Sequence, residues 1–376
     1  MKVDSPLYLT WIAATVLAYW LSPKVFRYLV LVFSTTLLLL YIDPLSLLVL
    51  SVGSLVTVYV IRQAASSLTL VAVGLVCMLL LTVKITFAFN ANNFAESFVL
   101  FGVSFYTLRM IHVLLEHYLE NYAALNSSTL LAYLFFPAII AAGPIERAEN
   151  FESPGSKVFD ISQFCLGLER LLHGLVLIVF VHNYLFRIVV IPFLKNKAAN
   201  SPTALEWVDC LHYGIGLYLQ FSAYSSIAIG FALLLGYSIA ENFNWPFLRT
   251  SLVSFWRHWH ITLSDFCRRY VFSGVLSVSR SVPLAFLASM ISIGLWHAAS
   301  LNFLFWGLYH GIGLLVTQWW LRCSLFQRIS VSLPETLIRF FGWVITVTIV
   351  FASFAWTRHN SLEASLASFA TLLGVN

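Results

Sequence analysis

The sequence predicts an all-α polytopic membrane protein, and three observations support this fold class. Hydrophobic residues make up 60% of the 376 residues and charged residues only 10%, whereas about a quarter of a soluble domain is charged. Long runs such as residues 28–42 and 68–83 contain no charge, and about 18 or more apolar residues cross the hydrocarbon core as a helix. The short alternating strands of a membrane β-barrel do not occur in the sequence.

Eleven apolar stretches are candidates for membrane helices, and a short apolar tail follows at 361–374. In chain order the stretches are 6–22, 25–42, 44–62, 67–89, 97–118, 128–142, 162–191, 205–236, 283–298, 301–321 and 338–356. Two of them, 162–191 and 205–236, are too long for one straight span and are expected to be broken or tilted. The first stretch has no cleavage site of small residues after it and is interpreted as a retained helix. No repeat or long linker divides the chain, so residues 1–376 are expected to form one domain.

Composition and motifs exclude several kinds of site. The five cysteines are scattered without a CxxC pair, which argues against a disulfide framework and against a metal site. The net charge of +5 is ordinary for basic cytoplasmic loops and gives no reason to expect a nucleic-acid partner. The sequence has no GxSxG, P-loop, HExxH or dinucleotide motif. We therefore expect no bound cofactor, and energy for any group transfer has to arrive in an activated donor such as a thioester.

Two connecting regions are unusual for a membrane protein. In residues 135–155, Pro137 and the Gly143–Pro144 pair break the helix near membrane depth. Irregular backbone at that depth is tolerated only where it is buried in protein or lines a wet cavity. Residues 240–264 form the second region, which carries several polar residues before a Ser/Thr-rich helix start.

Residues 255–270 concentrate polar groups between tryptophans. On a helical wheel one stripe about 80° wide carries Arg257, His260, Ser264 and Arg268. Apolar side chains fill the opposite side, so the segment predicts an amphipathic helix that lies along the membrane face or dips into it. Arg269 and Arg280 follow and place this end on the cytoplasmic side. The simpler interpretation of the stripe is a helix whose basic side chains extend into the lipid headgroups.

One histidine stands out between the apolar runs of residues 294–311. His297 lies near the end of the 283–298 stretch, where an ionisable group is costly unless it faces a cavity or a partner. A pKa near 6.5 suits such a group to taking and returning a proton at neutral pH. The alternative is a buried histidine bonded to a carbonyl group. His310 lies thirteen residues later and fits a packing role better.

Five segments resemble the membrane-bound O-acyltransferase (MBOAT) family, and specifically the bacterial branch that acetylates alginate and D-alanylates teichoic acids. The most specific are "ENFNWPFLRTSLVSFWRHWHITLSDFCRRYVF" (241–272) and "GLWHAASLNFLFWGLYHG" (294–311). The others are "FGVSFYTLRMIHVLLEHY" (101–118), "FFPAIIAAGPIERAENF" (135–151) and "LQFSAYSSIAIGFALLLGY" (219–237). In order they cover a core of about residues 101–313. Spans before this core match the family in hydropathy alone.

The resemblance implies a bundle of about ten to twelve transmembrane helices, with re-entrant or horizontal helices, around a tunnel. It implies that His297 is catalytic and that His260 is a second catalytic residue. We expect the donor to bind at Arg257, Arg268, Arg269 and Asn244. We expect the oxyanion to be supported by Asn302 or Trp296.

Several positions depart from the pattern of the branch, among them His258, which stands where the branch has arginine. Gln220 and Ser226 stand where the branch has aspartates, and Ala298 stands where it has the glycine after the catalytic histidine. Lost carboxylates are consistent with a different acceptor or an altered charge balance near the site.

The resemblance implies transfer of an acyl group, with acetyl preferred, from a cytoplasmic thioester to a hydroxyl acceptor. The donor would be acetyl-CoA or an acyl carrier protein. The acceptor would be an extracytoplasmic polysaccharide, a lipid, or a periplasmic partner enzyme that completes the transfer. We expect the chain to sit among membrane lipids in a bacterial cytoplasmic membrane. Two alternatives stay open: a transporter or flippase, since buried histidines and broken helices also fit a permeation path, and a non-catalytic scaffold.

Overall fold

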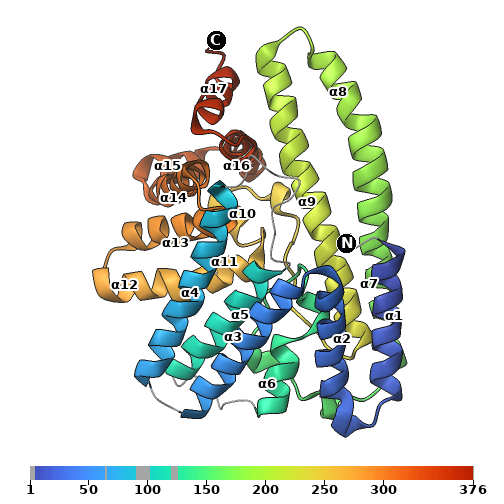
Figure 1. Cartoon of the computed structure of the whole chain (residues 1–376). Helices are drawn as coiled ribbons and strands as arrows, with labels where there is room; N and C mark the ends of the chain where they lie inside the picture. Colours follow the sequence, from blue (N-terminus) through green and yellow to red (C-terminus); the bar gives the residue numbers. More distant parts are fainter. Residues whose placement is uncertain (1–4, 64–65, 90–101, 120–125, 376) are drawn as a thin grey trace. The chain divides into compact units, whose positions relative to one another are not determined.

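The apolar stretches of the sequence are helices in the computed structural model, which describes residues 5–63, 66–89, 102–119 and 126–375 (Figure 1). No β-strand longer than a single bridge occurs among these described residues. The chain groups into two compact units, one of residues 1–179 and 221–241, the other of residues 180–220 and 242–376. The all-α prediction is confirmed, and the expectation of one domain stays a prediction.

Helices of the first unit follow the apolar stretches closely. They are α1 (Pro6–Leu21), α2 (Arg27–Ile42), α3 (Pro44–Gln63), α4 (Ser66–Phe89), α5 (Val103–Tyr118), α6 (Ser127–Leu134), α7 (Ile161–Leu175) and the later part of α9 (Pro202–Leu234). The first two helices pack on each other, and α5 packs on both α3 and α4. Small residues let α7 approach α9 closely: a Cβ atom on Gly174 would lie 2.8 Å from the carbonyl oxygen of Ala223.

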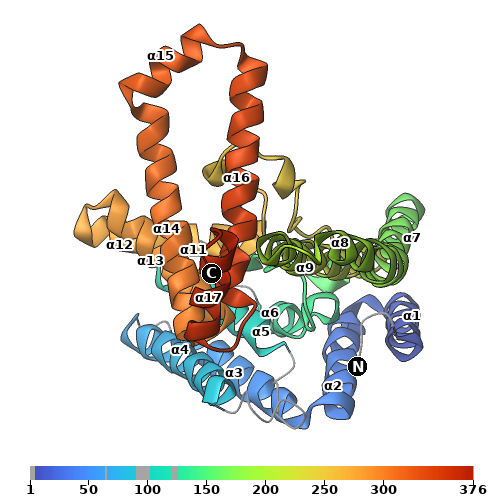
Figure 2. The ribbon, with the colours of Figure 1, turned by 90° about the horizontal axis from the view of Figure 1, so that it is seen from above.

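The second unit contains the remaining helices. They are the later part of the π-helix Val176–Val190, α8 (Ile191–Ala198), the first part of α9, α10 (Leu252–Trp256), α11 (Ile261–Cys267), α12 (Ser273–Ser279), α13 (Val282–His297), α14 (Leu301–Arg322), α15 (Ser324–Ser332), α16 (Glu335–Thr357) and α17 (Leu362–Leu372). A second π-helix, Arg268–Phe272, joins α11 to α12. Figure 2 shows α14, α15 and α16 as one long hairpin.

Six of the described helical segments are long and apolar enough to cross a membrane. They are Lys24–Ile42, Pro44–Gln63, Ser67–Thr86, Ile161–Ala198, Pro202–Leu234 and Glu335–Thr357. Shorter apolar helices, among them α1 and α13, accompany them. The chain is therefore an integral membrane protein of helical type, as its composition predicts.

Some predicted boundaries were wrong. The stretch 128–142 is not one helix, because α6 ends at Leu134 and a 3₁₀ turn follows at Pro137–Ile139. The stretch 162–191, expected to be broken or tilted, is not broken, since a π-helix joins α7 to α8 without interruption, and a tilt stays a prediction. Helix α9 likewise runs unbroken through residues 202–234. The start of the stretch 97–118 lies outside the described residues.

Most of residues 135–148, the irregular region after α6, is buried in protein, which is one of the two settings that its helix breakers allow. Glu146 is buried there, and its carboxylate accepts hydrogen bonds from the backbone N–H groups of Arg147 (3.1 Å) and Ala240 (2.8 Å). The phenol of Tyr133 donates to the carbonyl oxygen of Glu146 at 2.8 Å. These hydrogen bonds satisfy backbone N–H and C=O groups that lie outside the helices and therefore have no partner within a helix.

Close backbone packing between α13 and α14 fixes the part of the second unit that carries His297. A Cβ atom on Gly294 would overlap the carbonyl oxygen of Phe303, and one on Gly307 would lie 2.6 Å from the carbonyl oxygen of Met290. Gly307 and Gly311 form a GxxxG pair, which lets two helices approach within a membrane. The end of α13 is thereby held against the first turns of α14.

Candidate active site

His297 is the last residue of α13, directly before the turn into α14. Ser300 caps α14 by accepting a hydrogen bond from the N–H of Phe303, and the Ala298 N–H donates to the Gly294 carbonyl at 3.1 Å. The imidazole of His297 is half-buried and has an aromatic surrounding. Its ring centroid lies 5.9 Å from that of Phe303 and 5.8 Å from that of Trp306.

His260 lies in a sharp turn rather than on a continuous helix. The predicted amphipathic helix over 255–270 was wrong, because α10 ends at Trp256 and α11 begins only at Ile261. The backbone of His260 has φ 44° and ψ 53°, which is the left-handed region. A residue with a Cβ atom adopts this conformation at a cost, and such strain is common at functional sites.

A short antiparallel pairing holds this turn in place. The carbonyl oxygen of Asn242 accepts from the Ile261 N–H at 2.9 Å, and its side-chain oxygen accepts from the Thr262 hydroxyl at 2.6 Å. The Asn244 N–H donates to the carbonyl of His258 at 3.0 Å. Asn242 is fully buried, so both bonds are protected from water. The polar segment before Pro246 therefore serves to shape the histidine turn.

The turn brings His260 to His297. Their ring centroids are 6.5 Å apart and both rings contact Trp296, whose centroid is 5.8 Å from His260 and 4.9 Å from His297. His260 is only 2% exposed. Burial, followed by repulsion from His297, holds the pKa of His260 well below its ordinary value. His260 is therefore neutral at pH 7.

A cluster of aromatic rings behind this pair was not expected from the sequence as part of the site. Trp306 contacts His297 and also His310, whose ring centroid is 4.8 Å away. The indole N–H of Trp256 donates to Nδ1 of His310 at 3.4 Å. His310 is 1% exposed, so the packing role expected for it fits this geometry. The i, i+4 spacing of Trp306 and His310 on one face of α14 is the signal that could have identified the cluster.

The basic residues expected to hold the donor lie on two separate elements, the turn after α10 and the π-helix after α11. Arg257 is exposed in the turn between α10 and α11. Arg268 is exposed and pairs with Asp265 at 3.0 Å, while the Arg269 guanidinium lies 5.9 Å from the Tyr270 ring centroid. The carbonyl and side-chain oxygens of Asn244 accept from Arg249 at 2.6 and 3.2 Å. The continuous stripe predicted for the basic residues is wrong because the helix breaks at His260, and their role in binding stays a prediction.

The two candidates for oxyanion support differ in their surroundings. Asn302 is buried, and its amide nitrogen donates to the carbonyl oxygens of His359 (2.8 Å) and Ser361 (3.2 Å) and to the hydroxyl of Ser365 (2.9 Å). Those acceptors take up its donor capacity, so this geometry gives Asn302 a structural role and does not support an oxyanion role. Trp296 lies against both histidines and stays the candidate.

The arrangement can carry acid–base chemistry. It places a half-buried imidazole at a helix end beside a second, neutral imidazole, within a wall of tryptophan and phenylalanine rings. Such a wall excludes water and strengthens electrostatic interactions at the reacting group. No group of three or more histidine, cysteine, aspartate or glutamate side chains that could bind a metal occurs in the described part of the chain.

Comparison with known proteins identifies the family of the chain. Residues 26–355 match the membrane-bound O-acyltransferase family. The "Probable alginate O-acetylase AlgI" of Pseudomonas aeruginosa is 29% identical over 292 residues, which are 75% of this chain and 53% of that protein. The peptidoglycan O-acetyltransferase of Helicobacter pylori is 28% identical over 312 residues, covering 73% of this chain and 57% of that protein.

A third relative, the teichoic acid D-alanyltransferase of Streptococcus thermophilus, is 26% identical over 268 residues, covering 66% of this chain and 63% of that protein. The chain thus spans little more than half the length of the first two relatives. The family match covers most of the chain and includes both histidines. The chain therefore belongs to the membrane-bound O-acyltransferase family.

Proposed function

We propose that this protein is a membrane O-acyltransferase that moves an acyl group, preferably acetyl, from a thioester donor to a hydroxyl acceptor, with His297 as the general base. The observation that carries the proposal is the His260–His297 pair, two imidazoles from different elements at 6.5 Å between ring centroids. Membership in the MBOAT family supports the reaction class.

In the proposed reaction His297 removes the proton of the acceptor hydroxyl as the oxygen attacks the thioester carbonyl. The new C–O bond forms, the C–S bond breaks, and the imidazolium returns its proton to the departing thiolate. An N–H group such as that of the Trp296 indole would stabilise the oxyanion. His260, which is neutral, would orient the reacting groups without placing a second positive charge beside the imidazolium.

Exposed guanidinium groups support the choice of an anionic donor. Arg257 lies three residues before His260, and acetyl-CoA and the phosphopantetheine arm of a carrier protein both carry phosphate. Arg268, which is exposed, and Arg269, which is half-buried, follow His260 by eight and nine residues. We propose that these three arginines attract the anionic donor. The thioester carbonyl of the donor would then lie next to His297.

The acceptor is proposed to be a polysaccharide outside a bacterial cytoplasmic membrane, or a partner enzyme that passes the acyl group on. The relatives support this class, because they are named for alginate, peptidoglycan and teichoic acid. All three are polymers that carry hydroxyl groups. The tunnel that would join the two sides of the membrane stays a prediction.

Release of free CoA tests the proposed function. The purified protein is incubated with acetyl-CoA and with soluble fragments of alginate, peptidoglycan or teichoic acid, and the free thiol and acyl ester are measured. The proposal expects thiol release that depends on acceptor, with one ester formed for each thiol. A carrier-protein thioester replaces acetyl-CoA in a parallel series.

Two results would contradict the proposal. Movement of substrate across proteoliposomes without an acyl ester in any series would indicate a transporter. Wild-type behaviour of a His297→Ala variant in cells, together with loss of function on changing surface loops, would indicate a scaffold.

A further inference from the structure

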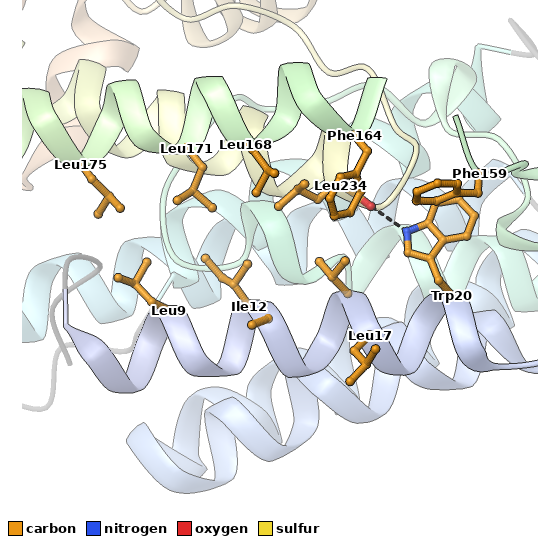
Figure 3. A pocket seen from close by; sticks show the side chains of 12 residues that line it. Leu9, Ile12, Leu17, Trp20, Phe159, Phe164, Leu168, Leu171, Leu175 and Leu234 are labelled. Atoms are coloured by element: carbon orange, nitrogen blue, oxygen red, sulfur yellow. Dashed lines mark hydrogen bonds between the residues drawn. The ribbon is translucent and has the colours of Figure 1, made fainter. Parts of the chain in front are cut away.

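An apolar groove of about 540 Å³ runs between α1 and α7 in the first unit, far in sequence from the histidine pair. Figure 3 shows its two walls. Its lining is apolar and includes Ala13, Leu17 and Trp20 of α1, Phe159 and Leu168 before and on α7, and Leu234 at the end of α9. We propose that this groove binds an acyl chain of a bilayer phospholipid, with the lipid phosphate at Arg27.

The size and chemistry of the groove fit a hydrocarbon chain. Small-molecule sites commonly measure about 300–1,000 Å³, so the groove can hold a substantial ligand. One wall, α7, belongs to the 38-residue apolar segment Ile161–Ala198, which is long enough to cross a membrane. Leu17 and Leu168 remain exposed at the edges of the groove. In a bilayer an acyl chain restores the dispersion contacts that an unfilled groove would forfeit.

One end of the groove is closed by aromatic rings. The indole N–H of Trp20 donates to the carbonyl oxygen of Leu234 at 2.8 Å, the bond drawn as a dashed line in Figure 3. Phe159 packs edge-on against Trp20 with 5.3 Å between centroids. Tryptophan favours the level of the lipid headgroups in membrane proteins. This end of the groove is therefore where the chain of a bound lipid would meet its headgroup.

A buried positive charge adjoins that end. The guanidinium of Arg27 lies 4.8 Å from the Trp20 ring centroid, and Arg27 is only 7% exposed. Its Nη1 donates to the carbonyl oxygen of Lys157 at 2.6 Å, while its Nε is buried without a hydrogen-bond partner. Among the described carboxylates, none forms an ion pair with Arg27. Within the described part of the chain the charge is compensated only by the Lys157 carbonyl and by the rings of Trp20 and Tyr19, the latter 5.1 Å away, so a phosphate would supply the missing counter-ion and acceptor oxygens.

Nearby acidic groups are already engaged. Glu152 pairs with Lys157 at 3.0 Å, and Asp160 caps α7 by accepting from the Ser162 N–H at 2.7 Å. Lys24 is exposed three residues before Arg27 and adds positive charge at the same helix junction. The junction therefore favours an anion, whereas the groove favours a hydrocarbon, and a phospholipid combines the two.

Photolabelling tests the inference in the full chain. The protein is reconstituted in vesicles of phosphatidylcholine and phosphatidylglycerol with a trace of phosphatidylglycerol that carries a diazirine on its acyl chain, and the labelled peptides are mapped. The proposal expects labels concentrated on residues 6–21 and 161–175. Ala13→Trp, which fills the groove, should lower this labelling about tenfold. Ala14→Trp is the matched control, since Ala14 is also exposed on α1 but does not line the groove, and it should leave labelling unchanged.

A second photolabelling experiment tests the contact between Arg27 and the lipid phosphate. A diazirine-bearing diacylglycerol, which lacks phosphate, should label the groove less than the phospholipid does. Arg27→Gln should abolish that preference and Arg27→Lys should keep it. If Arg27→Gln does not fold, Lys24→Gln carries the test and should reduce the preference.

Two outcomes would overturn the inference. Equal labelling of all exposed helices, unchanged by Ala13→Trp, would mean that only ordinary bulk lipid surrounds α1 and α7. Absence of lipid label from the groove, with crosslinks between copies of the chain, would mean that protein covers it. Neither outcome bears on acyl transfer, because the inference does not rest on the proposed function.

Discussion

His260 and His297 face each other with 6.5 Å between their ring centroids and an angle of 56° between the rings, although one lies in a strained turn and the other ends a helix. The turn depends on the buried Asn242, and the helix end depends on glycine contacts between α13 and α14. The distance between the two imidazole rings thus depends on two independent parts of the fold. Changes in either part should therefore affect the chemistry without touching an imidazole.

Gly294→Ala should weaken both the fold and acyl transfer. The added Cβ would overlap the carbonyl oxygen of Phe303, and overpacking of this kind costs about 1–3 kcal/mol. Thermal denaturation in detergent measures the loss of stability, and thiol release measures the activity. Gly274→Ala is the control, because nothing lies within 4 Å of a Cβ there. A Gly294→Ala protein as stable and active as the wild type would argue against close packing of α13 on α14.

His260 should make the fold less stable at acidic pH. Burial and His297 depress its pKa in the folded state, so below about pH 6.5 the unfolded chain binds a proton that the folded chain does not. Stability should therefore fall as the pH drops below 6.5, by up to ~1.4 kcal/mol per pH unit from this group. Above pH 6.5 the group should contribute no pH dependence.

The His260→Asn variant isolates this contribution. Asparagine tolerates the left-handed backbone at position 260, and it carries no titratable proton in this range. The difference in melting temperature between wild type and variant, followed from about pH 5 to pH 8, should change with pH only below 6.5. A constant difference across that range would show that His260 titrates normally in the folded protein.

Asn302→Ala should loosen the C-terminal segment. The change removes the donor to His359, Ser361 and Ser365, and an unsatisfied buried group costs about 1–3 kcal/mol. Limited proteolysis should cut near residues 359–361 sooner than in the wild type, whereas Asn196→Ala, an exposed change on α8, should not alter the pattern. A drop in kcat of about 100-fold in a protein of unchanged stability would instead restore the oxyanion role.

The sequence predicts those structural features that neighbouring residues determine, and it does not predict those that depend on residues far away in the chain. Apolar run length located most helices within a few residues, because hydrocarbon thickness sets helix length in a membrane. His297 could be identified because an ionisable group beside apolar runs is costly. The break at His260 could not, because the helical periodicity of 255–270 is real but the pairing with Asn242 overrides it. The partners of Asn302 come from almost sixty residues away and leave no local signal.

Arg257→Ala should raise KM for an anionic thioester donor while changing kcat little. A hydrogen bond to a charged group contributes about 1.5–3 kcal/mol, so KM should rise by about tenfold or more. The effect should shrink as ionic strength rises, since Arg257 is exposed. Arg328→Ala, an exposed change on α15, is the control. Equal KM values for the Arg257 variant and the wild type at low salt would return Arg257 to a role at the lipid headgroups.

Single-turnover acyl transfer by His297→Ala tests the central claim most directly. Wild type and variant, each shown by thermal denaturation to be folded, are loaded with labelled donor and then mixed with acceptor, and ester formation is followed. Loss of a general base should slow the acyl-transfer step by about 10²–10⁴-fold while donor binding is retained, and His173→Ala, an exposed histidine on α7, should behave as wild type. Ester formation by the folded His297→Ala protein at the wild-type rate would contradict the assignment of His297 as the base.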